Sequence, residues 1–495
     1  MWQARWRARP FSNMRAKLRI IPLYSPNHCV KNAEHVCSSI IFCTFAVIMM
    51  NWNQLISNRR LGQEHRHPER HDDRTEFKRD YDRLIFSAPF RRLQNKTQVF
   101  PLPGSVFVHN RLTHSLEVAS VGMSLGNDVA RLLCEKTPAY ADTLVPEIGQ
   151  IVATACLAHD MGNPPFGHSG EKAIQSFFTE GKGAYLQEKV SAAFWSDITH
   201  FEGNANAFRL LTHHFDGRRR GGFVMTYSTL ASIVKYPFTS NLAGEHQKFG
   251  FFTSEREAYQ RIATRLGIPQ LDAPMGALRY ARFPLVYLVE AADDICYEIM
   301  DIEDAHKLKL LSTADTRELL LAYFPPERQC QILEHISQCG VDDDGEQIVY
   351  LRSSVINLLE NECVQVFVDN EADILAGRFT GSLIEHISPT PRRAYEACVE
   401  ASYRHIYHCR EVVDIELAGF RVMTELMHLM VEAAMNPQRA YSQLILGRVS
   451  KQYQIRSQRI YDRLLAVLDY ISGMTDVYAL DLYRKTTGIS LRMES

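Results

Sequence analysis

Apolar residues recur at helical spacing along most of the chain. Residues 111–134 predict an amphipathic helix, because apolar side chains return every four or five positions, at Leu112, Leu116, Val121 and Leu125. A second helix is predicted from Pro146 to Ala158. Proline suits the first helical position, and the segment Gly-Asn-Pro-Pro at 162–165 cannot continue a helix.

Two further helices are indicated in the middle of the chain. Ser254 and Glu257 have the spacing of a capping box, which predicts a helix that ends at Gly267. Residues 282–308 read as one long helix, and residues 310–495 are again mostly helical in pattern. Because few stretches alternate with a period of two, the predicted fold class is all-α.

The predicted helix 282–308 carries a row of carboxylates. At about 100° per residue, one arc of its surface holds Glu290, Asp293, Asp294, Tyr297, Asp301 and Asp304. Neither lysine nor arginine lies among them, so their charges repel. A solvated outer face is the simpler interpretation. Because the flanking residues Tyr287, Ala291 and Met300 are apolar, we favour a partly buried row that a metal ion or polar ligand neutralises.

Composition and charge narrow the protein class. The chain has 495 residues, 46% of them hydrophobic and 23% charged, as in ordinary globular proteins with a buried core. Its net charge of −2 argues against a dedicated nucleic-acid-binding domain, which is usually far more basic. Eleven cysteines occur without a C-x-x-C pair, so we expect reduced thiols and a cytoplasmic location.

The N-terminal residues differ from the rest. Residues 1–37 are basic and irregular, and the apolar run 38–50 is shorter than the roughly 20 residues of a membrane-spanning helix. A basic stretch before an apolar one resembles a signal peptide, but no small-residue cleavage site follows. We expect Met50 to be the true start, residues 1–49 to be a non-native upstream extension, and no membrane role.

Histidine and aspartate residues at two helix ends suggest a metal site. His159 and Asp160 precede the Gly-Asn-Pro-Pro turn, which would expose both side chains, and His114 opens the helix 111–134. A single histidine is more often a core or surface residue than a ligand. Together with one aspartate of the pair 293/294, however, these residues offer two nitrogens and two carboxylates. Such a set suits Mg²⁺, Mn²⁺, Ni²⁺ or Fe²⁺, and the lack of a cysteine ligand argues against structural zinc.

Several longer strings resemble one enzyme family, the bacterial deoxyguanosine triphosphate triphosphohydrolases of the HD-domain superfamily. The strings are FRRLQNKTQVFPL (90–102), NRLTHSLEV (110–118), AHDMGNPPFGHSGE (158–171), HFEGNANAFRLL (200–211), PLVYLVEAADDICY (284–297) and DYISGMTDVYALDLY (469–483). The resemblance implies an HD-type catalytic core over residues 50–310. It also implies a C-terminal helical region, residues 311–495, that completes the nucleotide pocket and makes oligomer contacts. The implied reaction converts dGTP, or other dNTPs, to a deoxynucleoside and tripolyphosphate.

The resemblance also implies residue roles. It gives one divalent ion the ligands His114, His159, Asp160 and Asp293, and it selects Asp293 over Asp294. His168 and Glu171 match the catalytic pair. The implied substrate-binding positions are Gln98, Val99, Arg111, Asn204, Lys235, Tyr236, Tyr297, Asp301 and Glu416. Asn206 and Tyr407 depart from the family pattern, in which glutamine and phenylalanine are usual, and this bears on base selectivity.

Each of these residues also has a purely structural interpretation. His168 could cap the helix near Glu171, Lys235 and Tyr236 could simply end a helix before Pro237, and Tyr297 and Asp301 could be helix-interface residues. The basic run 218–220 is expected to be a solvated loop, with a phosphate- or single-strand-contacting loop as the alternative.

Two other function classes stay open. One is a different HD-type nucleotidase or phosphodiesterase, and the other is a non-catalytic nucleotide-sensing oligomer. The resemblance further implies a homo-oligomer, either tetramer or hexamer, with nucleotide or single-stranded DNA as candidate regulators. The sequence does not decide the native metal, the base preference or whether His168 activates water or protonates the leaving group.

Overall fold

The described part of the chain is almost entirely helical. The computed structural model describes residues 49–65, 72–100, 108–244, 247–338 and 343–489. Within them the strands β1 (Gln270–Leu271) and β2 (Arg279–Tyr280) form one short antiparallel hairpin, in which Gln270 pairs with Tyr280. The predicted all-α class is therefore confirmed. In the described residues no helix combines the length and the apolar character that crossing a bilayer requires.

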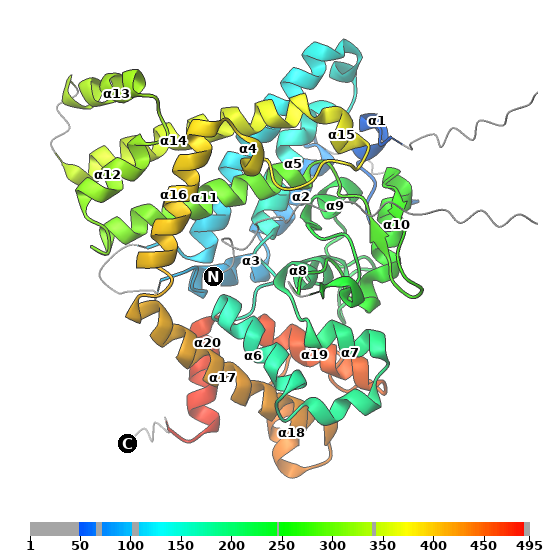
Figure 1. The fold of residues 1–495 in the computed structure, drawn as a ribbon. Helices are drawn as coiled ribbons and strands as arrows, with labels where there is room; N and C mark the ends of the chain where they lie inside the picture. Colours follow the sequence, from blue (N-terminus) through cyan, green and yellow to red (C-terminus); the bar gives the residue numbers. More distant parts are fainter. Residues whose placement is uncertain (1–48, 66–71, 101–107, 245–246, 339–342, 490–495) are drawn as a thin grey trace, which may run out of the picture. The chain divides into compact units, whose positions relative to one another are not determined.

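Four helices build the centre of the first hydrophobic core, shown in Figure 1: α4 (Arg111–Lys136), α5 (Ile148–Ala158), α11 (Val286–Lys307) and α14 (Asp344–Asp369). Every residue of α5 except Gln150 is buried, and this helix packs against α4 and α11. Gly126 allows the closest approach, since a Cβ there would lie 2.6 Å from the Gly149 Cα. The predicted helices 111–134, 146–158 and 282–308 are confirmed, although α5 opens with a 3₁₀ turn and α11 begins at Val286.

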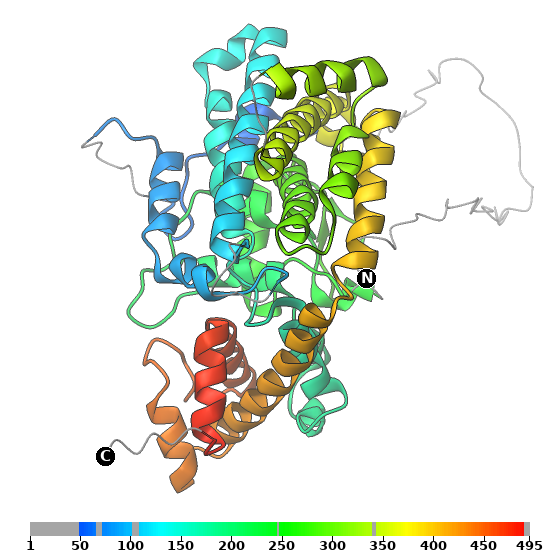
Figure 2. The same ribbon diagram turned by 90° about the vertical axis from the view of Figure 1, so that its left-hand side faces the viewer.

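The second hydrophobic core joins segments that are far apart in the sequence. Helix α6 (Gly167–Thr179) packs against α17 (Arg410–Met435), which also contacts α18 (Ala440–Gly447), α19 (Ile460–Ser472) and α20 (Asp476–Thr486). Phe178 of α6, Met423 of α17 and Leu465 of α19 are buried in this core. Figure 2 shows α17, α18 and α20 gathered together. Helix α6, which carries His168 and Glu171, is therefore held by the C-terminal helices.

The capping-box prediction for α10 (Arg256–Leu266) is wrong. Glu255 is the N-cap and makes no side-chain capping bond, because a 3₁₀ turn precedes the helix. The Ser254 hydroxyl donates instead to the carboxylate of Glu255 (2.6 Å). The predicted end is correct: Gly267 adopts the left-handed conformation (φ 70°) that glycine tolerates best.

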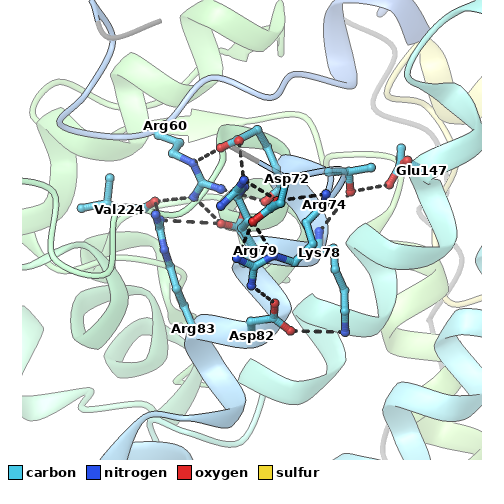
Figure 3. Close-up of polar contacts among 12 residues, drawn as sticks. Arg60, Asp72, Arg74, Lys78, Arg79, Asp82, Arg83, Glu147 and Val224 are labelled. Atoms are coloured by element: carbon cyan, nitrogen blue, oxygen red, sulfur yellow. Dashed lines mark hydrogen bonds and ion pairs between the residues drawn. The ribbon is translucent and has the colours of Figure 1, made fainter. Parts of the chain in front are cut away.

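An ionic network fixes α2 (Glu76–Ile85) against the segment around residue 224. The Arg60 guanidinium donates to the Val224 carbonyl (2.7 Å) and to the buried carboxylate of Asp80 (2.5 Å). Arg83 also donates to the Val224 carbonyl, and Figure 3 shows both arginines reaching this oxygen. The segment that follows the basic run 218–220 is thereby anchored to the N-terminal helices.

The remaining helices surround these two cores. They are α1 (Trp52–Leu55), α3 (Ala88–Arg92), α7 (Ala192–Thr199), α8 (Gly203–Thr212), α9 (Tyr227–Ile233), α12 (Thr313–Leu321), α13 (Pro326–Gln338), α15 (Glu371–Leu375) and α16 (Pro389–His405). The expected upstream extension lies outside the described residues except for Met49. The predicted division into 50–310 and 311–495 stays a prediction.

Candidate active site

Three helices bring two histidines and one aspartate together. His114 lies in the first turn of α4, His159 caps the C-terminus of α5, and Asp293 lies in α11. The Oδ1 atom of Asp293 is 3.0 Å from Nε2 of His114 and 3.5 Å from Nε2 of His159. One potential ligand atom from each residue lies within 4.8 Å of the others, so this group could hold a metal ion.

Asp160 lies beside this cluster. Its Oδ1 is 3.7 Å from Nε2 of His159 and accepts a hydrogen bond from the Asn163 amide. Its Oδ2 is buried 2.9 Å from Nη1 of Arg111 and, among the described residues, has no hydrogen bond of acceptable geometry. A buried carboxylate oxygen without a hydrogen bond is costly unless another ligand completes it. Two imidazoles and two carboxylates, one of them with an oxygen that has an ion-pair partner but no hydrogen bond among the described residues, therefore fit a divalent cation.

The two carboxylates dominate the electrostatics of the cluster, and a bound cation would replace the proton that they favour on His159. Burial acts to lower the pKa of His159, but the carboxylates of Asp160 and Asp293 outweigh it and raise that pKa to about 9. Burial acts to raise the pKa of Asp293, whereas the neighbouring histidines hold it well below its usual range. The two carboxylates therefore keep their negative charge and attract a cation to this position.

His168 stands on the far side of a tight turn from Asp160. Phe166 (φ 60°) and Gly167 (φ 55°) are both left-handed, and α6 begins immediately after Phe166. A Cβ at Gly167 would lie 2.6 Å from Nη2 of Arg111, so a side chain there would displace that guanidinium. His168 is exposed, whereas Glu171 is buried and accepts a hydrogen bond from the Gly203 amide (2.7 Å).

The surroundings of His168 keep its imidazole neutral. Desolvation by the surrounding protein lowers the pKa of His168 most. The positive charges of Lys248 and Arg111 lower it further. Because the side chain itself is exposed, water moderates the desolvation, but the two cations act in the same direction. His168 is therefore able to accept a proton at neutral pH.

Two buried charged residues hold the turn that carries His168. The carboxylate of Asp476, at the start of α20, accepts hydrogen bonds from the backbone amides of Phe166 (3.0 Å) and Thr97 (2.8 Å). The Lys96 ammonium donates to the carbonyls of Asn163 (2.5 Å) and Ser472 (2.7 Å). These bonds tie the turn 160–167 to the C-terminal helices.

Sequence reasoning did not single out Lys96 or Asp476. Both lie within strings that resemble the family, but each gains its role only from backbone groups of remote segments. No local pattern signals such contacts.

The carboxylate row on α11 is partly buried, and basic residues from other segments neutralise part of it. The Glu290 carboxylate lies 3.0 Å from Nζ of Lys235 and 2.5 Å from Nη2 of Arg282. Asp304 accepts from the His109 ring (2.9 Å). The predicted partial burial is confirmed. Neutralisation by a metal ion or polar ligand stays a prediction, and the basic partners of Glu290 and Asp304 are remote residues that sequence neighbours do not reveal.

The aromatic residue Tyr297 lies next to the cluster. Its ring centroid is 6.3 Å from that of His114, in an edge-to-face arrangement. One helical turn further on, Asp301 is buried and accepts a hydrogen bond from the Tyr407 hydroxyl (2.9 Å). Burial, and then the nearby charge of Glu298, raise the pKa of Asp301 well above its usual range. The tyrosine at 407 therefore gives Asp301 a donor that phenylalanine would lack.

The other predicted substrate-binding residues have contacts away from the cluster of His114, His159 and Asp293. Gln98 has a buried Oε1 without a hydrogen-bond partner among the described residues, and Val99 packs against the first core. Asn204 donates to Glu202 (2.6 Å). Tyr236 is half-buried beside Lys235, whose Nζ lies 5.8 Å from its ring centroid. Glu416 is exposed on α17.

The contacts of these residues do not join them to the metal cluster, so their roles stay predictions. Asn206 has a structural environment: its amide donates to the Gly162 carbonyl (2.7 Å) and to the Ser472 hydroxyl (3.1 Å).

Comparison with known proteins agrees with this geometry. The HD domain family matches residues 111–247, and the phosphohydrolase-associated domain matches residues 386–485. A deoxyguanosinetriphosphate triphosphohydrolase-like protein of Pseudomonas aeruginosa is 38% identical, over 89% of this chain and 99% of its own length. A protein of the same name from Synechocystis sp. is 37% identical, over 89% of this chain and 100% of its own length.

A relative with the unqualified name is also similar. The deoxyguanosinetriphosphate triphosphohydrolase of Yersinia enterocolitica is 29% identical, over 83% of this chain and 93% of its own length. The HD match includes the segments that supply His114, His159, Asp160 and His168, and the second match includes Asp476. The chain therefore belongs to the deoxyguanosinetriphosphate triphosphohydrolase family of HD-domain phosphohydrolases.

Proposed function

We propose that the protein hydrolyses dGTP to deoxyguanosine and tripolyphosphate, with a divalent cation held by His114, His159, Asp160 and Asp293. The observation that carries this proposal is the convergence of two imidazoles and two carboxylates from three helices, beside Arg111. The chemistry that a divalent cation supplies in such a site is Lewis acidity, which stabilises negative charge on phosphate oxygens.

Two cationic side chains receive the triphosphate. Arg111 is buried, and its fork can bind two phosphate oxygens at once while Asp160 fixes its orientation. Lys235 offers a point charge that Glu290 holds in place. Tyr297, whose ring lies edge-on to His114, is the candidate platform for the sugar. A ribose hydroxyl at the 2′ position would have to fit against this ring, so we expect GTP to be a poor substrate.

His168 carries the proton in this proposal. Water attacks the α-phosphorus and gives a proton to the neutral His168 ring. The bond from phosphorus to the sugar 5′-oxygen then breaks, and His168 returns the proton to that oxygen. The triphosphate's negative charge opposes the charges of Lys248 and Arg111 and raises the pKa of His168 in the complex. Such general acid–base catalysis contributes roughly 10²–10⁴-fold to the rate.

Product analysis tests the reaction class. The purified full chain with Mg²⁺ or Mn²⁺ and dGTP is expected to release deoxyguanosine and tripolyphosphate in equal amounts, measured by anion-exchange and reversed-phase chromatography. GTP under the same conditions is the control for sugar selectivity. Release of pyrophosphate or orthophosphate as the first product, or hydrolysis of phosphodiesters alone, would contradict the proposal.

The acidic limb of the pH profile reports on His168. Because its pKa lies below the ordinary value of about 6.5, the wild-type kcat/KM for dGTP is expected to stay high until the pH falls below 6.5. The substitution Lys248→Gln removes one cation but keeps a donor for Glu202, which Lys248 contacts at 2.8 Å. We expect it to move the limb to higher pH.

The matched control is Lys182→Gln, at an exposed lysine outside the surroundings of His168. Its pH profile should superimpose on that of the wild type. Identical limbs in both variants and the wild type would show that the charge of Lys248 does not set the pKa that the profile reports.

A further inference from the structure

A small cavity borders the turn that links Asp160 to His168, at Met161. Its volume is about 90 Å³. Its lining includes Arg92, Lys96, Met161, Arg218, Tyr453 and Asp469. Met161 directly follows Asp160, and the Lys96 ammonium donates to the carbonyl of Asn163 in the same turn. The cavity is therefore adjacent to the candidate active site, but it is lined by different residues from those that gather around Asp293.

Two arginines, Arg92 and Arg218, line the cavity. Arg92 donates to the Gly473 carbonyl (3.1 Å), and the Arg218 guanidinium lies 4.7 Å from the Phe223 ring centroid. Among the described residues neither arginine has an aspartate or glutamate within ion-pair distance. Burial, and the charge of Arg92, lower the pKa of Arg218, so the two guanidinium groups are within electrostatic reach of each other.

The one carboxylate in the described lining is already neutralised. Both oxygens of Asp469 accept from the buried Arg209 guanidinium, at 2.8 and 2.7 Å. The cavity therefore keeps an excess of positive charge from Arg92 and Arg218. Tyr453 and Asn206 add polar groups to its wall.

Size restricts the ligand. Sites for drug-sized molecules and cofactors commonly occupy about 300–1,000 Å³, several times the volume of this cavity. A nucleotide does not fit inside it, whereas a single tetrahedral oxyanion does. Arginine is the side chain best suited to a phosphate-type anion, since its fork binds two oxygens in parallel.

We propose that this cavity binds one phosphate-type oxyanion between Arg92 and Arg218. The basic run 218–220 would then have two parts with different roles, because Arg218 lines the cavity whereas Arg219 and Arg220 are exposed. This site does not depend on the proposed reaction, and the binding test below requires no turnover.

Thermal unfolding in orthophosphate tests the site. Orthophosphate is expected to raise the Tm of the full-length wild-type protein, since a ligand of the native state stabilises it. In Arg218→Ala, the orthophosphate concentration needed for half of the shift should rise by about tenfold or more, because a charge-assisted bond is lost. Sulfate should give the same pattern, and chloride at equal ionic strength should give no shift.

Arg219→Ala is the matched control, since it removes the same charge from the neighbouring position. Both variants leave the active site intact, so phosphate that binds there affects them equally. The difference in orthophosphate dependence between the two variants therefore reports on the cavity alone. Arg92→Lys provides a second test, because it keeps a donor for Gly473 but loses the fork, and it should also weaken binding. Equal orthophosphate dependence in Arg218→Ala and Arg219→Ala would overturn the proposal.

Discussion

Replacing Asp293 with asparagine is expected to lower kcat/KM for dGTP by about 10³-fold or more. Oδ1 of Asp293 lies 3.0 Å from Nε2 of His114 and 3.5 Å from Nε2 of His159. The substitution removes the negative charge of this side chain and keeps its shape. A catalytic cation contributes several kcal/mol of charge stabilisation, and each 1.36 kcal/mol is worth a factor of ten in rate. Steady-state kinetics with saturating Mn²⁺, together with metal analysis of the dialysed protein, measure this effect.

The neighbouring Asp294→Asn is the control. Burial raises the pKa of Asp294 above its ordinary value, which favours the protonated form, and an amide replaces that form closely. Asp294→Asn should therefore retain most of the activity and the bound metal. Comparable losses of kcat/KM and of bound metal in both variants would show that the charge of Asp293 is not specifically required for metal binding or catalysis.

Helix patterns could predict much of the fold because they are local. The spacing of apolar residues located α4, the prolines at 146 and 164–165 marked the two ends of α5, and Gly267 marked the end of α10. Partial burial of the α11 carboxylate row also followed from its apolar flanks. The capping box at Ser254 failed because the same Ser-x-x-Glu spacing is compatible with a 3₁₀ turn, and only the surrounding contacts choose between them.

The candidate site was less accessible from the sequence, because its geometry comes from remote pairs. Helix geometry left Asp293 and Asp294 equivalent, and the family resemblance chose Asp293, which the structure places beside both histidines. Lys235 lies 55 positions from Glu290 in the sequence, yet the two side chains form an ion pair. Such pairs arise when helices pack, so no periodicity or short motif reports them.

Replacing Asp476 with asparagine is expected to lower kcat for dGTP by about 10²-fold while changing KM little. Each carboxylate oxygen of Asp476 accepts one backbone amide, from Phe166 or Thr97. Asparagine keeps one acceptor and turns an NH₂ group toward the other amide, so one bond is lost and two donors face each other. Phe166 immediately precedes α6, and a shift of about 1 Å in a catalytic group can cost 10²-fold in rate. Steady-state kinetics measure the separation of kcat from KM.

Asp481→Asn on the same helix is the matched control for this last effect. Asp481 is half-exposed and pairs with Lys485 at 2.7 Å in an i, i+4 arrangement, which contributes only about 0.3–0.5 kcal/mol. Its removal should leave kcat, KM and Tm close to wild type. Loss of a buried acceptor in Asp476→Asn should cost about 1–3 kcal/mol of stability, so both variants are assayed well below their Tm. A lower Tm with an unchanged kcat would show that Asp476 stabilises the second core without positioning His168, whereas a selective fall in kcat assigns it the positioning role.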